Sequence, residues 1–179
     1  MTYEERTMVK KLMKIVSNSK NEFYVNSLKE EFLTFFTVDV TKKPYYVRYL
    51  LESAYNSKND EDVEYALFIV FAFNLFSDAF LEILCNLIIV DWHFQHEDIC
   101  LILQKIKSPN SVNALYKASL LNLEYLSYSD ASPLARKCVW ALGGIKTEES
   151  KEKLELLSKS DDELIRNTAK YQLENWIYQ

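Results

Sequence analysis

The sequence predicts an all-α protein with about ten helices, and three observations support this fold class. Apolar residues recur at intervals of three and four residues along almost the whole chain, and no convincing alternating run is present. The 179 residues include only two glycines and three prolines, whereas strand-rich folds need turn residues at short intervals. Hydrophobic residues make up 49% of the chain, which excludes disorder as its default state.

The first half of the chain is expected to form five helices. The N-terminal stretch contains Glu4 and Glu5 and places its apolar residues on one helical face, so it is neither a secretory nor a transit signal. Pro44 stands where a first-turn proline belongs, because its missing N–H would have no partner there. The apolar run over residues 65–76 is too short for the roughly 20 residues that a bilayer needs, and predicts a buried core helix. The expected helices are 3–16, 21–37, 44–56, 62–76 and 78–90.

The second half is expected to form five more helices. Pro109 and Pro133 also occupy first-turn positions, and the pair Gly143–Gly144 is expected to close a helix, where a left-handed cap favours glycine. The pair Asp161–Asp162 is expected to cap the last helix. The expected helices are 95–107, 110–126, 133–145, 148–159 and 162–177.

Cysteine usage and charge indicate the compartment and the kind of partner. Cys85, Cys100 and Cys138 are odd in number and follow no paired spacing, which favours buried free thiols in a reducing cytoplasm. Residues 59–132 carry three Lys and Arg against eleven Asp and Glu, whereas residues 1–58 carry ten against seven. An acidic block repels nucleic acid and anionic lipid and attracts cationic surfaces, although a merely solvated acidic face has the same composition. Neither nucleic acid nor a membrane is expected as a partner.

Internal repetition is the strongest feature of the sequence. The stretch LARKCVWALGGI, residues 134–145, superimposes on IRNTAKYQLENW, residues 165–176, at an offset of 31. Residues 96–115 superimpose on residues 135–154 at an offset of 39. The longer offset comes from one enlarged connection, NLEYLSYSDAS, between the two helices of a hairpin.

The matching positions of these stretches are small or apolar and are followed by a short polar link to the next helix. This pattern resembles HEAT-type repeats of the kind found in phycobilin-lyase-like proteins. The resemblance implies a HEAT-like α-solenoid of stacked antiparallel helical hairpins, because neighbouring hairpins must cover each other's apolar faces. The repeats are expected over residues 61–179, with residues 1–60 as an N-terminal helical segment of the same compact domain.

The octet DWHFQHED, residues 91–98, contains both histidines of the chain and has three interpretations. A metal site would use His93 and His96 at i, i+3 on a helix with Glu97 or Asp98 as a third ligand, but no other histidine and no paired cysteine motif is available. A helix start would use Asp91 to cap exposed N–H groups, with the later acids near the positive end of the helix dipole. A recognition surface would present the acids to a partner.

The recognition surface would combine acids and aromatic residues of neighbouring repeats. Carboxylates suit a basic partner, and tyrosine offers a large contact area with a polar tip. Tyr125 and Tyr128 also fit a role in packing their own long loop, and Trp140 fits either an interface anchor or a cover over that insertion. No catalytic residue, metal ligand or cofactor is assigned. The candidate partner-binding residues are His93, His96, Glu97, Asp98, Glu124, Tyr125, Tyr128, Asp130 and Trp140.

Two segments carry a second resemblance: DWHFQHEDICLILQKIKSPNSVNALYKASL and YLSYSDASPLARKCVWALGGIKTEESKEKLELL. They resemble the small HEAT-repeat immunity proteins that neutralise bacterial polymorphic toxins, including those of contact-dependent growth inhibition. The resemblance implies a cytoplasmic, non-enzymatic monomer that binds the C-terminal domain of a cognate toxin one to one. Such toxins are often basic nucleases, which would give the acidic block a purpose. Two alternatives stay open: a scaffold for another protein, and a metal-dependent or lyase-like enzyme using His93, His96 and Glu97.

Overall fold

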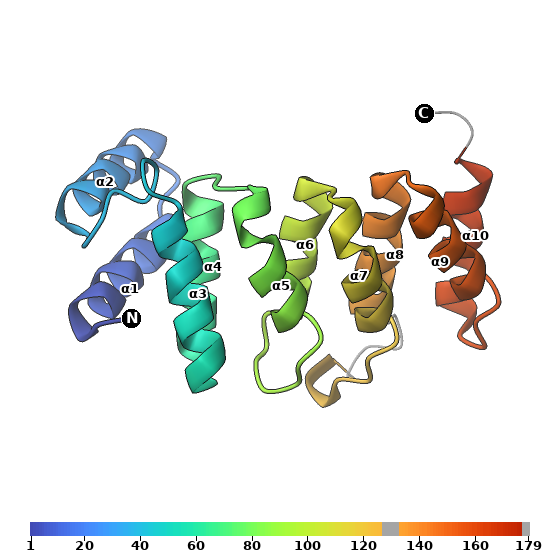
Figure 1. The fold of residues 1–179 in the computed structure, drawn as a ribbon. Coiled ribbons are helices and arrows are strands. Elements are labelled where there is room, and N and C mark those ends of the chain that lie inside the picture. Colours follow the sequence, from blue (N-terminus) through green and yellow to red (C-terminus); the bar gives the residue numbers. More distant parts are fainter. Residues whose placement is uncertain (127–132, 177–179) are drawn as a thin grey trace. The chain divides into compact units, whose positions relative to one another are not determined.

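The computed structural model describes residues 1–126 and 133–176, and these residues are all-helical. They form ten α-helices and no strand, as the sequence predicts. The chain divides into two compact units, Met1–Ala79 (unit 1) and Phe80–Gln179 (unit 2) (Figure 1). The boundary between the two units lies near residue 79.

Unit 1 contains four helices, and the fourth explains the position of the boundary. α4 contacts both α1 and α3, and its buried Val63, Ala66 and Val70 belong to the core of unit 1. Thr2 and Glu5 form a capping box at the start of the first helix, where side chains satisfy otherwise unpaired backbone N–H groups. The helices are α1 (Tyr3–Asn18), α2 (Glu22–Phe35), α3 (Tyr45–Ser57) and α4 (Asp60–Ala72).

Charged side chains join α1 to the start of α4. Arg6 binds Asp62 through two hydrogen bonds, Nε to Oδ1 at 2.7 Å and Nη2 to Oδ2 at 2.9 Å. Burial raises the pKa of Asp62, but the hydrogen bonds from Arg6 and the Met1 amino group outweigh it and hold the pKa below its usual value. Lys10 pairs with Glu61 at 2.9 Å. The basic N-terminal helix thus neutralises the first acids of the acidic block.

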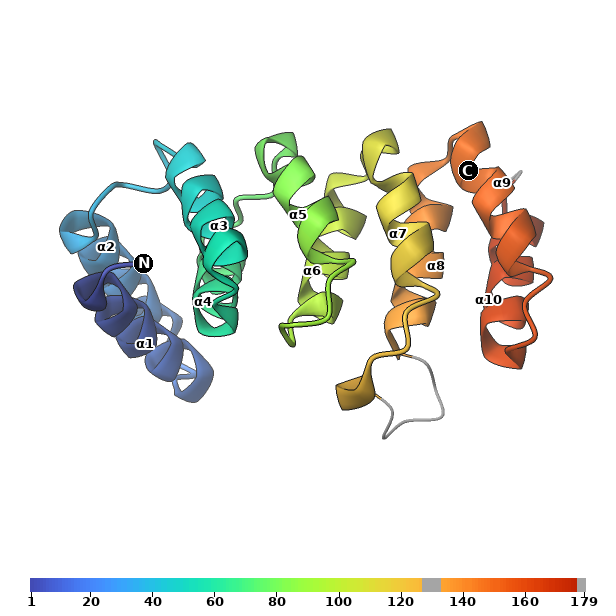
Figure 2. The same ribbon diagram turned by 60° about the horizontal axis from the view of Figure 1, so that its bottom comes forward.

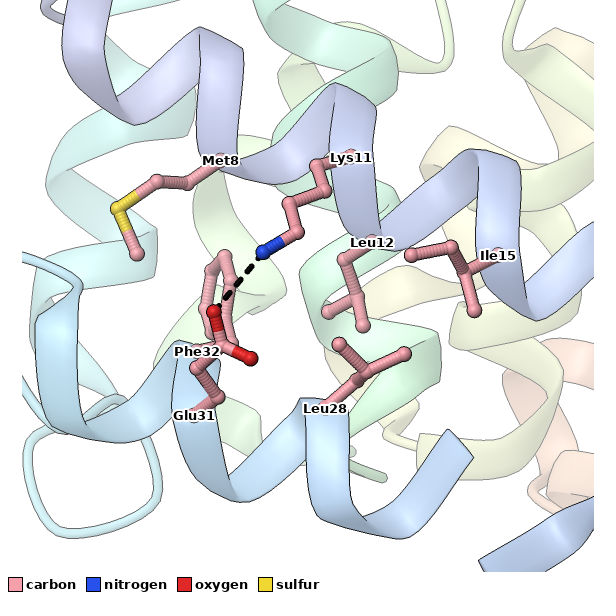
Figure 3. A pocket seen from close by; sticks show the side chains of 7 residues that line it. All are labelled: Met8, Lys11, Leu12, Ile15, Leu28, Glu31 and Phe32. Carbon is pink, nitrogen blue, oxygen red and sulfur yellow. Dashed lines mark hydrogen bonds and ion pairs between the residues drawn. The ribbon is translucent and has the colours of Figure 1, made fainter. Parts of the chain in front are cut away.

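Packing between α1 and α2 leaves a small cavity of about 60 Å³ (Figure 3). Its walls are mainly apolar, and an ion pair between Lys11 Nζ and Glu31 Oε1, at 2.8 Å, spans it. A row of aromatic rings in contact also joins α2, α3 and the end of α4 within unit 1. Phe32 stacks on Phe73 of the α4 C-terminus and on Phe36, which in turn contacts Tyr46 of α3 edge to face.

Unit 2 consists of three helical hairpins, α5–α6, α7–α8 and α9–α10 (Figures 1 and 2). The second helices contact one another in chain order, α6 with α8 and α8 with α10. The repeat alignment is visible in the core, because its equivalent residues Ile99, Cys138 and Ala169 are all fully buried. The helices are α5 (Leu81–Leu87), α6 (His96–Ile106), α7 (Val112–Ala118), α8 (Pro133–Ile145), α9 (Glu148–Leu157) and α10 (Glu163–Glu174).

Several predicted helix ends need correction. The expected helix 78–90 is a short 3-10 turn, η1 (Asp78–Phe80), followed by α5, and the expected helix 110–126 ends as α7 at Ala118 before a second turn, η3 (Glu124–Leu126). The pair Gly143–Gly144 does not form a left-handed cap, because both glycines lie inside α8 and neither has a positive φ. The left-handed residue after α8 is Lys146, with φ 61°, and its repeat equivalent Lys107 has φ 54°.

Candidate functional site

The loops inside the three hairpins of unit 2 lie along one edge of the unit (Figure 1). They connect α5 to α6, α7 to α8 and α9 to α10. We name their described residues, 88–95, 119–126 and 158–162, the loop edge. Six of the nine residues expected to bind a partner lie in these loop segments or at the adjoining start of α6. His93, His96 and Tyr125 contact one another there, whereas Glu97 pairs with Lys137 of α8.

His93 is fully buried and has a hydrogen-bond partner at each ring nitrogen. Its Nε2 lies 2.9 Å from the carbonyl oxygen of Leu87, the last residue of α5, so Nε2 carries the proton and donates. Its Nδ1 accepts from the backbone N–H of Gln95 at 3.1 Å. This pattern requires a neutral imidazole. If Nδ1 also carried a proton, it would be a donor pointing at the Gln95 N–H donor and could not accept that hydrogen bond.

His96 is also fully buried and stacks on His93, with 4.3 Å between the ring centroids. Its Nε2 donates to the carbonyl oxygen of Val90, and its Nδ1 accepts from the hydroxyl of Tyr125 at 2.8 Å. Burial lowers the pKa of His96, and the Val90 hydrogen bond and the charge of Asp91 only partly oppose this effect. His96 is therefore neutral near pH 7 and links the first loop to the second.

The two histidines cap the end of α5, a role that none of the three interpretations of the octet included. They supply donors for Leu87 and Val90, carbonyls at and just beyond the helix end, where intrahelical donors run out. Asp91 does not cap the next helix, since the residue before α6 is Gln95 and makes no side-chain cap. His93 also precedes α6, so the two imidazoles are not at i, i+3 on a helix.

The histidines do not fit a metal site or an exposed surface. Their ring nitrogens already have protein partners, and across residues 1–126 and 133–176 no group of three His, Cys, Asp or Glu side chains is placed to hold a metal ion. His93 and His96 were expected to contribute to a partner surface, and in this structure both side chains are 0% exposed. Their role is to hold the loop edge in place.

Tyr125 packs against the first loop rather than within its own, a contact that neither of its two interpretations included. Its ring contacts Phe94 edge to face, with centroids 5.3 Å apart, while its hydroxyl binds His96. Tyr125 is half-buried, so part of its side chain faces solvent. Tyr128 and Asp130 lie outside the described residues.

The acids at the start of α6 are close to a cation of α8. Glu97 Oε1 lies 2.9 Å from Lys137 Nζ. Burial raises the pKa of the half-buried Asp98, and Lys137 partly opposes this rise. The two positions were expected to be equivalent to Arg136 and Lys137 in the repeat, and the structure shows that stacking brings these opposite charges together. Glu97 is therefore not an unpaired acid offered to a partner.

Trp140 lies away from the loop edge, in the middle of α8. Its exposed indole contacts Tyr171 of α10, with ring centroids 5.6 Å apart. These two residues are equivalent in the repeat alignment, so they form an exposed aromatic pair on neighbouring helices. Within the described residues, Trp140 thus contacts a residue of the next repeat, Tyr171.

Exposed apolar side chains at the loop edge were not among the expected site residues. Phe94 is 59% exposed and Leu120 is 57% exposed, and Ile89 is also exposed. Exposed acids stand in the same three loops, namely Asp91, Glu124, Asp161 and Asp162. Apolar residues in loops between helices would have indicated this surface from the sequence. The predicted helices 78–90 and 110–126 were too long, however, so Ile89 and Leu120 were assigned to helix faces instead of loops.

Comparison of the chain with protein-family models, with curated proteins and with solved structures finds no match. Within the described ranges, 1–126 and 133–176, no helix has both the length and the apolar character needed to cross a membrane. The fold and the site together define an all-helical protein whose second unit consists of stacked hairpins. This unit carries a loop edge with exposed apolar and acidic residues, and two buried imidazoles join the first two of its three loops.

Proposed function

We propose that this chain is an immunity protein that binds and neutralises a cognate bacterial toxin domain in the cytoplasm. The observation that carries the proposal is the loop edge, where Phe94 and Leu120 are more than half exposed beside loop carboxylates. Exposed large apolar side chains surrounded by polar groups are typical of protein-binding surfaces. Acids among them favour a basic partner, such as a nuclease domain that binds nucleic acid.

The histidine network supports the proposal because it holds two of the three loops of the loop edge together before binding. His93 and His96 tie the first loop to the end of α5, and the Tyr125 hydroxyl ties the second loop to the first. A surface that is already ordered loses less conformational entropy when a partner binds. Occlusion of a toxin then needs binding alone, one molecule to one, and no catalysis.

The acids that serve such binding are those of the loops. Glu97 pairs with Lys137, and Asp62 with Arg6, so these carboxylates contribute little net field at the surface. Asp91 and Asp161 are exposed members of the loop edge and are the better candidates for steering a cationic partner.

The proposal is tested by co-expression with the C-terminal domain of the toxin encoded beside this chain. We expect a one-to-one complex, protection of the cells, and an association rate that falls as salt screens the charges. The variant Asp91→Lys with Asp161→Lys should slow association by about tenfold, since loss of complementary charge acts mainly on association. The matched control, Glu148→Lys with Glu152→Lys on α9, changes the net charge equally and should leave the rate unchanged.

The apolar contribution has its own matched pair. Leu120→Ala should speed dissociation by about tenfold, because truncation of a central apolar contact costs more than about 1 kcal/mol. Leu156→Ala on α9 removes a leucine of similar exposure, 50% against 57%, and should leave dissociation unchanged. Absence of a complex with the wild-type chain, or association that does not respond to salt, contradicts the proposal.

A second candidate function, a scaffold for a different protein, is favoured by unit 1. Phe23 is 84% exposed and Phe35 is 71% exposed on α2, and Tyr3 of α1 is also exposed. Exposed aromatic rings are typical of contact surfaces that exclude water on binding. If Phe23→Ser with Phe35→Ser abolishes the toxin complex while Leu120→Ala does not, the binding surface belongs to unit 1 and the loop-edge assignment is wrong.

A further inference from the structure

A cavity of about 440 Å³ opens at the loop edge, between the end of α7 and the starts of α8 and α10. Most of the described residues that line it are aliphatic and none is aromatic, while Ser119, Asn122 and Asp162 are its polar members. The space is in the range of sites that bind ligands or a large side chain. The apolar lining residues that matter most here are Leu120, Leu121, Leu123, Leu126, Leu134 and Ile165.

Asp162 is the charged side chain among the described residues that line the cavity. Asp162 Oδ1 accepts hydrogen bonds from the backbone N–H groups of Leu164 at 2.8 Å and Ile165 at 3.0 Å, so its position is fixed. Asp161 and Glu163, its exposed neighbours, add further negative charge. Two cations, Arg136 and the half-buried Arg166, lie next to lining positions in the sequence, and neither lines the cavity itself. Arg166 donates to the backbone carbonyls of Ser160 and Asp161, at 2.7 Å and 3.1 Å.

We infer that this cavity receives one large apolar side chain of the partner, from a segment in which Lys or Arg flanks that side chain. The inference rests on the proposed binding function of the loop edge and names the feature of the partner that is recognised. An aromatic or long aliphatic group would fill the aliphatic space, and the fixed Asp162 carboxylate would face the adjacent cation. Leu120, exposed at the cavity, offers further apolar area to the same segment.

The test uses a synthetic probe, the pentapeptide Lys-Lys-Trp-Lys-Lys, added to the full chain with labelled leucine methyl groups. We expect saturable shifts of the methyl signals of the cavity leucines. The peptide Lys-Lys-Ser-Lys-Lys should give no such shifts, and Glu-Glu-Trp-Glu-Glu should bind at least tenfold more weakly. Equal binding of the acidic peptide, or shifts confined to leucines elsewhere, overturns the inference.

Two variants check the location of binding. Ala135→Phe fills the cavity from α8 and should abolish the shifts, provided that thermal melting shows an intact fold. Leu120→Ser changes an exposed residue, so folding should be retained. The substitution should lower the affinity for the Trp peptide by about threefold or more, because it removes apolar contact area. Unchanged binding by Leu120→Ser overturns the inference even if Ala135→Phe unfolds.

The same variants separate this inference from the proposed function. If the toxin domain still binds Ala135→Phe with wild-type affinity, the cavity is not the recognition site, but the immunity proposal stands. If the Trp peptide binds the cavity while the toxin domain does not bind the wild-type chain, the immunity proposal fails and the cavity assignment stands.

Discussion

Unit 1 and unit 2 both bury polar side chains, but those of unit 1 are ionised and those of unit 2 are neutral. In unit 1, buried Asp62 binds Arg6, and buried Glu5 accepts a hydrogen bond from the Tyr46 hydroxyl at 2.6 Å. In unit 2, buried His93 and His96 bind backbone carbonyls and a tyrosine. A buried charge needs an opposite charge or several donors, whereas a neutral imidazole needs one acceptor and one donor.

Charge counted along the chain therefore overstates the charge at a surface. The acidic block over residues 59–132 crosses the boundary between the units. In unit 1, its Glu61 and Asp62 pair with Lys10 and Arg6. The acids that remain for a partner in unit 2 are mainly those of the loop edge, which is a smaller surface than the sequence indicates.

The largest effect is expected from removing the buried charge of unit 1. Asp62→Ala leaves the partly buried Arg6 guanidinium without its partner and should lower the free energy of unfolding by about 3 kcal/mol. Glu61→Ala removes a neighbouring acid that is 46% exposed, and its effect should be much smaller. Chemical denaturation followed by far-UV circular dichroism compares the two variants. Equal losses of stability would contradict the assignment of Asp62 as the structural charge.

A second test breaks the close approach of α8 and α10 in unit 2. A Cβ on Gly143 would lie 2.0 Å from Gln172 Oε1, whereas a Cβ on Gly144 meets only Lys107 Cε at 3.8 Å. Gly144→Ala should stabilise the helix by up to about 1 kcal/mol, while Gly143→Ala should be less stable than Gly144→Ala by about 1–3 kcal/mol.

Gln172→Ala supplies the control for this pair. It removes the obstructing side chain, whose Nε2 is buried and has no hydrogen-bond partner within the described residues. In the Gln172→Ala background, the two glycine substitutions should therefore have similar effects on the melting temperature. A persistent difference would show that another contact, rather than Gln172, requires Gly143.

Local patterns in the sequence predicted the helices, but not the contacts between them. α8 begins at Pro133 and ends at Ile145, as expected from its first-turn proline and apolar spacing. The end of α5 depends on His93 and His96, which are six residues from the carbonyls that they bind, and the link to Tyr125 spans 29 residues. Helical periodicity contains no information on such partners, so both imidazoles were expected at the surface.

The two units should differ in how their stability changes as the pH falls. The folded pKa of His96 lies below its unfolded value of about 6.5, so the unfolded state binds more protons as the pH falls. The stability contribution of His96 is complete above about pH 6.5. It should fall by at most about 1.4 kcal/mol per pH unit until the folded pKa is reached. Asp98, with a raised pKa, acts in the opposite direction at lower pH.

Unit 1 should respond in a lower pH window. Burial raises the pKa of Glu5, but the hydrogen bonds from Tyr46 and Thr2 outweigh it, and the pKa of Asp62 is lowered in the same way. Their contributions are therefore present above about pH 4.5 and are lost as the pH falls through the folded pKa values.

Tryptophan fluorescence measures the response of unit 2, because all three tryptophans, Trp92, Trp140 and Trp176, lie there. Denaturant midpoints should fall between pH 6.5 and pH 4.5 for the wild type (the window set by the two unfolded pKa values). In His96→Gln the fall should be smaller. If the variant and the wild type have the same pH dependence, His96 is not the titrating group.

The smallest effect on stability is expected for the ion pair between Glu97 and Lys137 of unit 2. Its side chains are 30% and 37% exposed, against 4% for Asp62, so water screens the attraction and solvates either partner when the other is removed. Glu97→Ala, Lys137→Ala and the double variant should yield a coupling energy of about 0.2–1 kcal/mol that decreases with added salt. The pair then contributes to charge balance at the start of α6 more than to stability. A coupling energy as large as the loss in Asp62→Ala would instead place a structural charge pair in unit 2 as well, and the contrast between ionised and neutral polar groups would no longer distinguish the units.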